Sequence, residues 1–195
     1  MNKSRPLSPD WFRCDAVDAA PALIGAILAR RRADGEVVRH RIVETEAYMP
    51  DDPACHAYRK VTGRTRIMYG PPGYAYVYVI YGIYHCFNLV TGPEGSPQAV
   101  LVRALEALTN EDPRTYAGPG RLCRALGISL AENAHALHPD VGGVWIEMGP
   151  PGTVKPPLLQ TTRVGVRLGA ETPWRWYWQE HPAVSVKAKR TPLSL

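Results

Sequence analysis

The segment RIVETEAY (Arg41–Tyr48) carries two glutamates two residues apart, in a run that is rich in β-branched residues. Successive side chains of a β-strand point to opposite faces, so alternate residues share a face. In this segment the alternate residues are Ile42, Glu44, Glu46 and Tyr48. Two carboxylates buried together raise the pKa of at least one of them, which suits a general base near neutral pH. An edge strand with two solvated glutamates is the alternative.

A long polar segment follows, from residue 49 to residue 73, and it contains His56 and Tyr58. A loop of this length inside a compact domain is usually functional or mobile. The same loop carries the basic residues Arg59, Lys60, Arg64 and Arg66. Basic side chains beside aromatic strands suit contact with phosphates, although a solvated basic loop has the same composition.

The stretch GYAYVYVIYGIYHCFNLV (Gly73–Val90) places tyrosines at alternate positions, namely Tyr74, Tyr76 and Tyr78. Such a row of rings is either part of a buried core or a stacking surface for a flat aromatic ligand. Tyr81 comes at the expected hairpin tip, where a ring has little protein to pack against. An exposed ring on a projecting hairpin can act as a wedge between stacked base pairs.

Two polar residues lie in the strands that follow. A buried Asn88 would need several hydrogen-bond partners, so it is suited to contact the edge of a planar substrate. Arg103 interrupts the apolar run AVLVRALEAL. A buried arginine must be paired, and Glu46 is a natural partner for it.

The chain must fold so that these residues meet. We expect helices at Val17–Arg32, capped by Asp18, and at Gly118–Ile128, and a capping box at Ser129–Glu132. Strands are expected at Glu36–Tyr48, Tyr74–Ile80, Ile83–Val90, Gln98–Leu108 and residues 142–149, 161–169 and 174–178. Strands outnumber helices without a βαβ rhythm, so we predict a single α+β domain with a curved, mostly antiparallel sheet, flanking helices and a protruding hairpin.

Length and composition narrow the functional class. The 195 residues suit one domain, whose ends, about residues 1–10 and 188–195, are expected to fray. A proline-rich surface loop is expected at residues 150–159.

No signal peptide or run of about 20 apolar residues is present, so we expect a cytoplasmic protein that does not span a membrane. The four cysteines lack zinc-site spacing, and the net charge of +5 permits a nucleic-acid partner.

The succession RIVETEAY, CHAY, TGRTRIMYGPPGYAYVYVIYGIYHCFN, AVLVRALE, GPGRLCRALGI and RVGV closely resembles the alkyladenine (3-methyladenine) DNA glycosylase family. The resemblance runs from about Ala22 to about Ser185, and it is most specific between Arg41 and Glu106. It implies a monomeric, monofunctional enzyme that uses water, with no metal and no cofactor, to excise alkylated and deaminated purines from damaged double-stranded DNA. A bacterial-type enzyme of this kind acts on the DNA of the nucleoid.

The resemblance also implies roles for individual residues. Glu46 is expected to activate water, which Arg103 and the backbone carbonyl of Val164 hold. The base pocket is expected to contain Tyr48, His56, Tyr78 and Asn88, with the base between Tyr78 on one side and Tyr48 with His56 on the other. Tyr81 is the expected intercalating residue. The other expected DNA contacts are Ile83, Tyr84, Arg64, Arg66, Gly120 and Arg121.

Departures from the family pattern bear on substrate range. Gly63 stands where proline is usual, Ile83 where methionine is frequent, and Arg121 where lysine is usual. Two other classes of function share some of these features. A lesion-binding module without catalysis would have no need of the Glu46–Arg103 arrangement, and a hydrolase of free nucleosides would not need an exposed Tyr81.

Overall fold

The structure, a computed structural model, describes residues 5–149 and 156–188. Its strands are β1 (Arg5–Pro6), β2 (Ile27–Arg31), β3 (Val37–Tyr48), β4 (Ala75–Ile80), β5 (Tyr84–Thr91), β6 (Gln98–Ala107), β7 (Val144–Met148), β8 (Leu158–Thr161) and β9 (Arg175–Trp178). Its α-helices are α1 (Ala16–Ala22) and α2 (Pro119–Leu126), and its 3₁₀ helices are η1 (Pro9–Arg13), η2 (Arg66–Tyr69), η3 (Pro113–Tyr116) and η4 (Leu130–Glu132).

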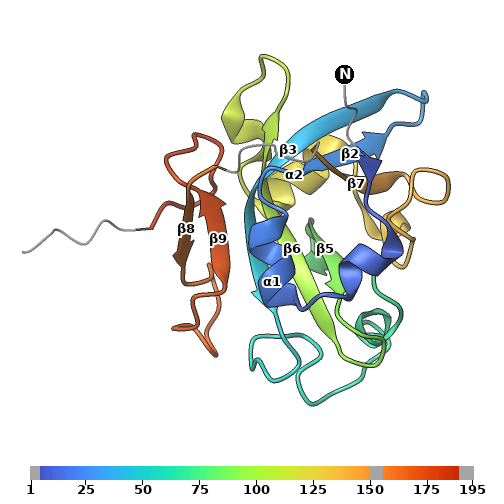
Figure 1. Cartoon of the computed structure of the whole chain (residues 1–195), viewed down its shortest axis with the longest axis vertical. Helices are drawn as coiled ribbons and strands as arrows, with labels where there is room; N and C mark the ends of the chain where they lie inside the picture. The colour runs from blue at the N-terminus through green and yellow to red at the C-terminus, as the bar shows by residue number, and fades with distance from the viewer. Residues whose placement is uncertain (1–4, 150–155, 189–195) are drawn as a thin grey trace, which may run out of the picture.

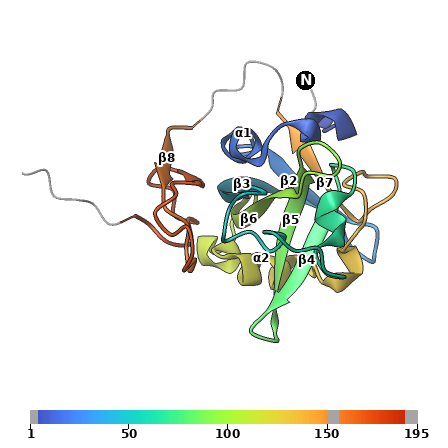
Figure 2. The same ribbon diagram turned by 90° about the horizontal axis from the view of Figure 1, so that it is seen from below.

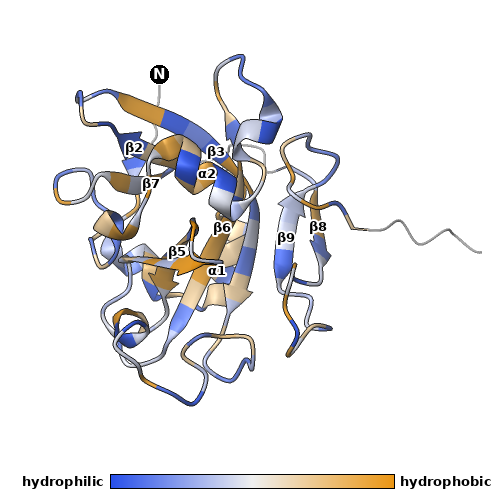
Figure 3. Ribbon diagram, turned by 180° about the vertical axis from the view of Figure 1, so that it is seen from behind, coloured by the Kyte–Doolittle hydropathy of each residue, from blue (hydrophilic) through white to orange (hydrophobic). Residues whose placement is uncertain are grey.

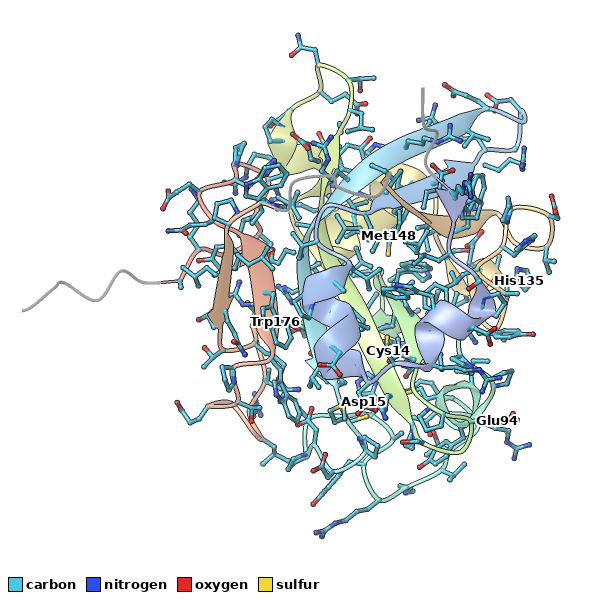
Figure 4. The ribbon with its side chains drawn as sticks, in the orientation of Figure 1. Cys14, Asp15, Glu94, His135, Met148 and Trp176 are labelled. Carbon is cyan, nitrogen blue, oxygen red and sulfur yellow. The ribbon has the colours of Figure 1, made fainter. Side chains whose placement is uncertain are left out.

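These strands form one antiparallel sheet in the order β1-β7-β2-β3-β6-β5-β4, with a branch in which β9 pairs with β3 and β8 with β9. Figure 1 shows α1 lying across the sheet and the β8–β9 pair at one side. Apolar residues of α1, α2 and the central strands belong to one buried cluster, and hydrophobic colour accordingly gathers on the inner strands in Figure 3. Trp176 of β9 extends this cluster in the space beside α1 (Figure 4). The predicted α+β class is therefore confirmed.

The long first helix predicted at Val17–Arg32 is wrong. The helix α1 ends at Ala22, and Gly25, with φ of +91°, turns the chain into β2. The strand β2 pairs with both β3 and β7, so hydrogen bonding from two neighbours decides its conformation over local helix propensity. The residue at the N-cap is Asp15 rather than the expected Asp18, and its side chain makes no capping hydrogen bond.

The strand β3 is irregular where it carries the two glutamates. Its register with β6 shifts between Ile42 and Glu44 and again between Glu44 and Thr45, which indicates a β-bulge. Ile42 packs in the main core together with Ala47. The two glutamates instead form polar contacts on the other side of the strand, so the predicted common face is wrong for Ile42.

The remaining predictions differ mainly at their boundaries. Residues 162–169, expected to continue a strand, form turns after β8, while β9 lies within the expected 174–178. The helix near residue 118 and the Ser129–Glu132 capping box are confirmed. Parts of two predictions lie outside the described residues. These are residues 1–4 and 189–195 of the expected frayed ends, and residues 150–155 of the expected proline-rich loop. Arg5–Pro6, also expected to fray, pairs with β7.

Within residues 5–149 and 156–188, no helix is long and apolar enough to cross a membrane. In the same residues no group of three or more His, Cys, Asp or Glu side chains is arranged to hold a metal ion. The four cysteines are free thiols.

The β4–β5 hairpin projects from the body of the molecule (Figure 2). Ile80 pairs with Tyr84, so the three residues between them form the turn, in which Tyr81 has φ of +54° and Gly82 has φ of +73°. The N-terminal turn of α2 packs against Tyr84, the first residue of β5 after the hairpin turn. A Cβ atom at Gly120 would lie 2.9 Å from Cδ1 of Tyr84, so only glycine allows this close approach.

We expect Gly120→Ala to destabilise the protein by about 1–3 kcal/mol, because the added methyl group would force α2 away from the hairpin. Urea unfolding of the variant measures this loss. In a Tyr84→Gly background the same substitution should cost much less, since both the opposing ring and its Cβ atom are absent. An equal loss in both backgrounds would contradict this packing explanation.

Candidate active site

A pocket of about 350 Å³ lies between the base of the hairpin, the end of β3, the N-terminus of α2 and the loop at residues 164–168. The predicted residues that line it are Tyr48, His56, Tyr78, Asn88, Arg103 and Val164. Tyr76, Cys86, Leu101 and Pro119 also line it. Its volume and its mixture of rings with a few polar groups are typical of a site for a small planar molecule.

Glu46 is fully buried beside this pocket, and three donors surround its carboxylate. The phenol of Tyr48 donates to Oε2 at 2.8 Å, and the backbone N–H of Val164 donates to Oε1 at 2.8 Å. Nη1 of Arg103 lies 3.3 Å from Oε1. The predicted Glu46–Arg103 pairing is therefore confirmed. These donors compensate the cost of burying a negative charge.

Glu44 holds the other side of the same arginine. It is fully buried, and its Oε1 accepts hydrogen bonds from Nε of Arg103 at 3.1 Å and from Nη1 of Arg175 at 2.8 Å. Its Oε2 accepts from the backbone N–H of Ser185 at 2.7 Å. Burial by itself lowers the pKa of Arg103, but Glu46 and Glu44 outweigh it and raise that pKa, so the guanidinium stays charged.

Sequence reasoning missed the partners that hold Glu44. Arg175 and Ser185 follow it by 131 and 141 residues, and neither belongs to a pattern that indicates an ion-pair network. The only signal in the sequence was that Glu44 lies two residues before Glu46. That spacing did not reveal that Arg103 bridges the two carboxylates.

One wall of the pocket is a cluster of rings. The ring centroids of His56 and Tyr78 are 4.5 Å apart at an interplanar angle of 75°, and those of Tyr76 and Tyr78 are 5.5 Å apart. The edge-to-face contact leaves no room for a base between His56 and Tyr78. The expectation that His56 would join Tyr48 opposite Tyr78 is therefore wrong. His56 belongs to the Tyr78 wall.

The imidazole of His56 is held by its surroundings in the neutral state at pH 7. Its Nδ1 lies 3.0 Å from the hydroxyl of Tyr76. Burial lowers the pKa of His56, and the nearby Arg64 guanidinium lowers it further. Arg64 itself lies 5.9 Å from the centroid of the Tyr78 ring, so the predicted basic loop does approach the pocket wall.

Tyr48 also lines the pocket, and a buried ion pair supports its ring. The guanidinium of Arg163 lies 4.8 Å from the Tyr48 ring centroid. It forms a two-point contact with Asp52, and its Nη1 also donates to the carbonyl oxygen of Ala47 at 3.0 Å. Burial, followed by the charge of Glu46, raises the pKa of Tyr48 well above its ordinary value, so its phenol remains a hydrogen-bond donor.

Asn88 is buried in the pocket lining, and the backbone fixes its side chain. Its Nδ2 donates to the carbonyl oxygens of Tyr76 at 3.0 Å and Cys86 at 3.3 Å. Both amide hydrogens are thereby used. The amide oxygen is left as the group that can meet a ligand.

The residues predicted to contact DNA lie outside the pocket. The exposed fractions of the hairpin side chains are 84% for Tyr81, 71% for Ile83 and 40% for Tyr84. Arg66 begins η2 and is exposed. Arg121 is exposed on α2, whereas Gly120 serves the packing of α2 against the hairpin.

Comparison with known proteins decides the family. The profile of the Methylpurine-DNA glycosylase (MPG) family matches residues 10–182. The chain belongs to the methylpurine-DNA glycosylase family. Members are hydrolases of N-glycosyl bonds in DNA, so the buried carboxylate beside an aromatic pocket belongs to a DNA-repair glycosylase.

Relatives match over nearly the whole chain. A protein of Synechococcus sp. (strain JA-3-3Ab) is 49% identical, with 90% of this chain and 97% of the relative covered. One of Synechococcus elongatus is 51% identical, with 90% and 88% covered. One of Trichodesmium erythraeum is 42% identical, with 95% and 100% covered. Each is named "Putative 3-methyladenine DNA glycosylase".

We expect Glu44→Ala to lower the free energy of unfolding by about 3–5 kcal/mol, because it leaves two buried guanidinium groups short of a carboxylate. Urea unfolding measures the loss. The matched control is Glu36→Ala, which removes an exposed partner of Arg32 and should cost less than about 1 kcal/mol. Similar losses in the two variants would show that the buried network contributes little.

Proposed function

We propose that this enzyme flips a damaged purine out of duplex DNA into the pocket and hydrolyses its N-glycosidic bond with a water molecule activated by Glu46. The product is an abasic site. The observation that carries the proposal is the fully buried carboxylate of Glu46, held by Arg103, Tyr48 and Val164 beside an aromatic-walled pocket. The substrate class comprises alkylated and deaminated purines such as 3-methyladenine, 7-methylguanine, hypoxanthine and ethenoadenine.

Base flipping is needed because the glycosidic bond inside a stacked duplex is out of reach of a buried carboxylate. Rotating a nucleotide out costs a few kcal/mol, and the cost is least at a damaged pair. Tyr81 is 84% exposed at the end of a projecting hairpin. Its ring would fill the vacancy and offset part of the cost of unstacking.

The flipped base would lie between Tyr48 on one side and the Tyr78–His56 wall on the other. Alkylation at N3 or N7 makes a purine cationic, and neutral electron-rich rings attract such a cation. The neutral state of His56 favours this, because a protonated imidazole would repel the base. Asn88 lines the pocket, and because the backbone fixes its side chain, it can disfavour guanine by steric exclusion of the extra amino group.

In the chemical step, positive charge develops on the sugar as the bond to the base lengthens. The carboxylate of Glu46 stabilises this charge and accepts a proton from the attacking water. Arg103 and the carbonyl oxygen of Val164 position that water. The N–H of Val164 already donates to Glu46, so this residue places its backbone beside the reacting atoms.

The reaction is proposed to stop at hydrolysis, as in a monofunctional enzyme. A Schiff-base lyase step would need an amine close to the sugar. None of the residues that line the pocket is a lysine, within the part of the chain that the structure describes. We propose that the enzyme acts as a monomer.

We expect Glu46→Gln to reduce single-turnover excision by about 10²–10⁴-fold, because the amide cannot accept the proton from water. Lesion DNA should still bind, since the side chain keeps its shape. Incubation with a methylated duplex followed by alkaline cleavage of abasic sites measures excision, and Glu36→Gln is the surface control. Near-normal turnover by Glu46→Gln would remove this residue from its proposed role. Absence of excision by the unmodified enzyme would favour a lesion-binding protein without catalysis.

We expect Tyr81→Ala to reduce the flipped population by about 10–100-fold, a loss of about 1–3 kcal/mol of stabilisation that the ring gives to the unstacked state. A 2-aminopurine placed beside the lesion reports unstacking as a rise in fluorescence. Val141→Ala provides the control, because this side chain is 70% exposed outside the pocket and the hairpin. An unchanged fluorescence rise with Tyr81→Ala would rule out the wedge.

A further inference from the structure

We propose that a second cleft, on the outer side of α2, binds backbone phosphates of the DNA strand beyond the flipped nucleotide. This arginine cleft has a volume of about 410 Å³ and is lined by Asp112, Arg114, Thr115, Arg121, Arg124 and Ala125. The proposal rests on the proposed function in that its ligand is the same damaged duplex. It adds a binding site that is separate from the base pocket.

The charges in the cleft are unbalanced. Three guanidinium groups face one carboxylate, Asp112, whose Oδ1 already accepts a hydrogen bond from the backbone N–H of Arg114. Among residues 5–149 and 156–188, none of the three arginines forms an ion pair. By contrast, Arg103, Arg163 and Arg175 each pair with a buried carboxylate.

One internal contact holds two of these arginines close together. Nη1 of Arg121 donates to the carbonyl oxygen of Arg114 at 3.2 Å, which ties α2 to η3. Arg121 and Arg124 are three residues apart and therefore lie on the same face of α2. Like charges gathered in this way repel one another until an anion neutralises them. The planar guanidinium fork suits a phosphodiester group.

The position of the cleft relative to the base pocket favours DNA as the source of that phosphate. Pro119 at the start of α2 lines the base pocket, and Gly120 packs against Tyr84 of the hairpin. Figure 2 shows α2 and the neighbouring η3 segment on the side from which the hairpin projects.

The two sites are also close together along α2. From Pro119, which lines the base pocket, to Arg124 in the arginine cleft the helix rises about 7.5 Å. A strand that delivers one nucleotide to the base pocket can therefore pass close to the arginine cleft.

Salt dependence of DNA binding tests the proposal. A lesion duplex of about two helical turns is titrated with enzyme at salt concentrations between about 50 and 200 mM. We expect Arg114→Gln and Arg124→Gln each to weaken binding about 5–10-fold near 0.1 M salt and to reduce the slope of log Kd against log salt by about one. Arg124→Lys, which keeps the charge, should restore most of the affinity.

Two further variants separate a local contact from a general effect. Arg13→Gln removes the same charge from η1, on the side away from the hairpin, and should leave the slope unchanged. Asp112→Asn removes the one carboxylate of the cleft while its side-chain oxygen can still cap η3. It should tighten binding, a result that partial unfolding cannot produce.

Excision by the unmodified enzyme is measured on the same duplex, so that the two proposals can fail separately. The arginine cleft alone would be overturned by the following result: Arg114→Gln and Arg124→Gln show the same slope of log Kd against log salt as Arg13→Gln, while excision is intact. Reduced slopes without excision by the unmodified enzyme would support the cleft and overturn the proposed reaction.

Discussion

The burial of two carboxylates against two guanidinium groups is the constraint on which the rest of this structure depends. Glu44, Glu46, Arg103 and Arg175 are each at most 6% exposed. An unpaired charge at that depth costs several kcal/mol. The fold must therefore bring all four charged groups together. The partners come from β3, β6, β9, the loop at residues 162–169 and the segment near Ser185. The β-bulge in β3 lies at Glu44, beside the point where the strand presents both carboxylates to Arg103.

The same ion-pair network stabilises the fold and, under the proposed function, holds the reacting groups. Arg103 contacts both carboxylates, and under the proposed function only Glu46 meets the water. Glu44 neutralises charge without facing the pocket, as its bonds to Arg175 and Ser185 show. A guanidinium held from both sides has little freedom to reorient, which is the property that preorganised electrostatic catalysis requires.

The pocket is lined by rings that are held in place, whereas the hairpin carries exposed side chains. Tyr48 is fixed between the pocket and the Arg163–Asp52 pair, and Tyr78 is fixed by His56 and Tyr76. Tyr81 and Ile83, by contrast, expose most of their apolar surface to water. Exposed apolar groups on a projecting element are typical of a surface that another molecule covers. Under the proposed function that molecule is the stacked duplex.

The sequence by itself determined the central elements of this protein. Alternation and β-branched residues predicted β3, β4, β5 and β6 nearly as they occur, and the need to pair a buried arginine predicted the contact between Arg103 and Glu46. The exposed position of Tyr81 also followed from local pattern, because a hairpin tip has few neighbours. These features depend on residues close in the chain, or on a charge whose burial permits few partners.

Only the tertiary structure decided the rest. Residues 27–31 form a strand because β3 and β7 pair with both of its edges, although their local sequence favoured a helix. Ile42 turns to the main core because of a bulge that no local signal marks. His56 lies on the Tyr78 wall because a long loop folds back over the hairpin, and Glu44 meets Ser185 across 141 residues. Register, loop paths and long-range ion pairs arise from the packing of the whole chain, so short-range periodicity carries no information about them.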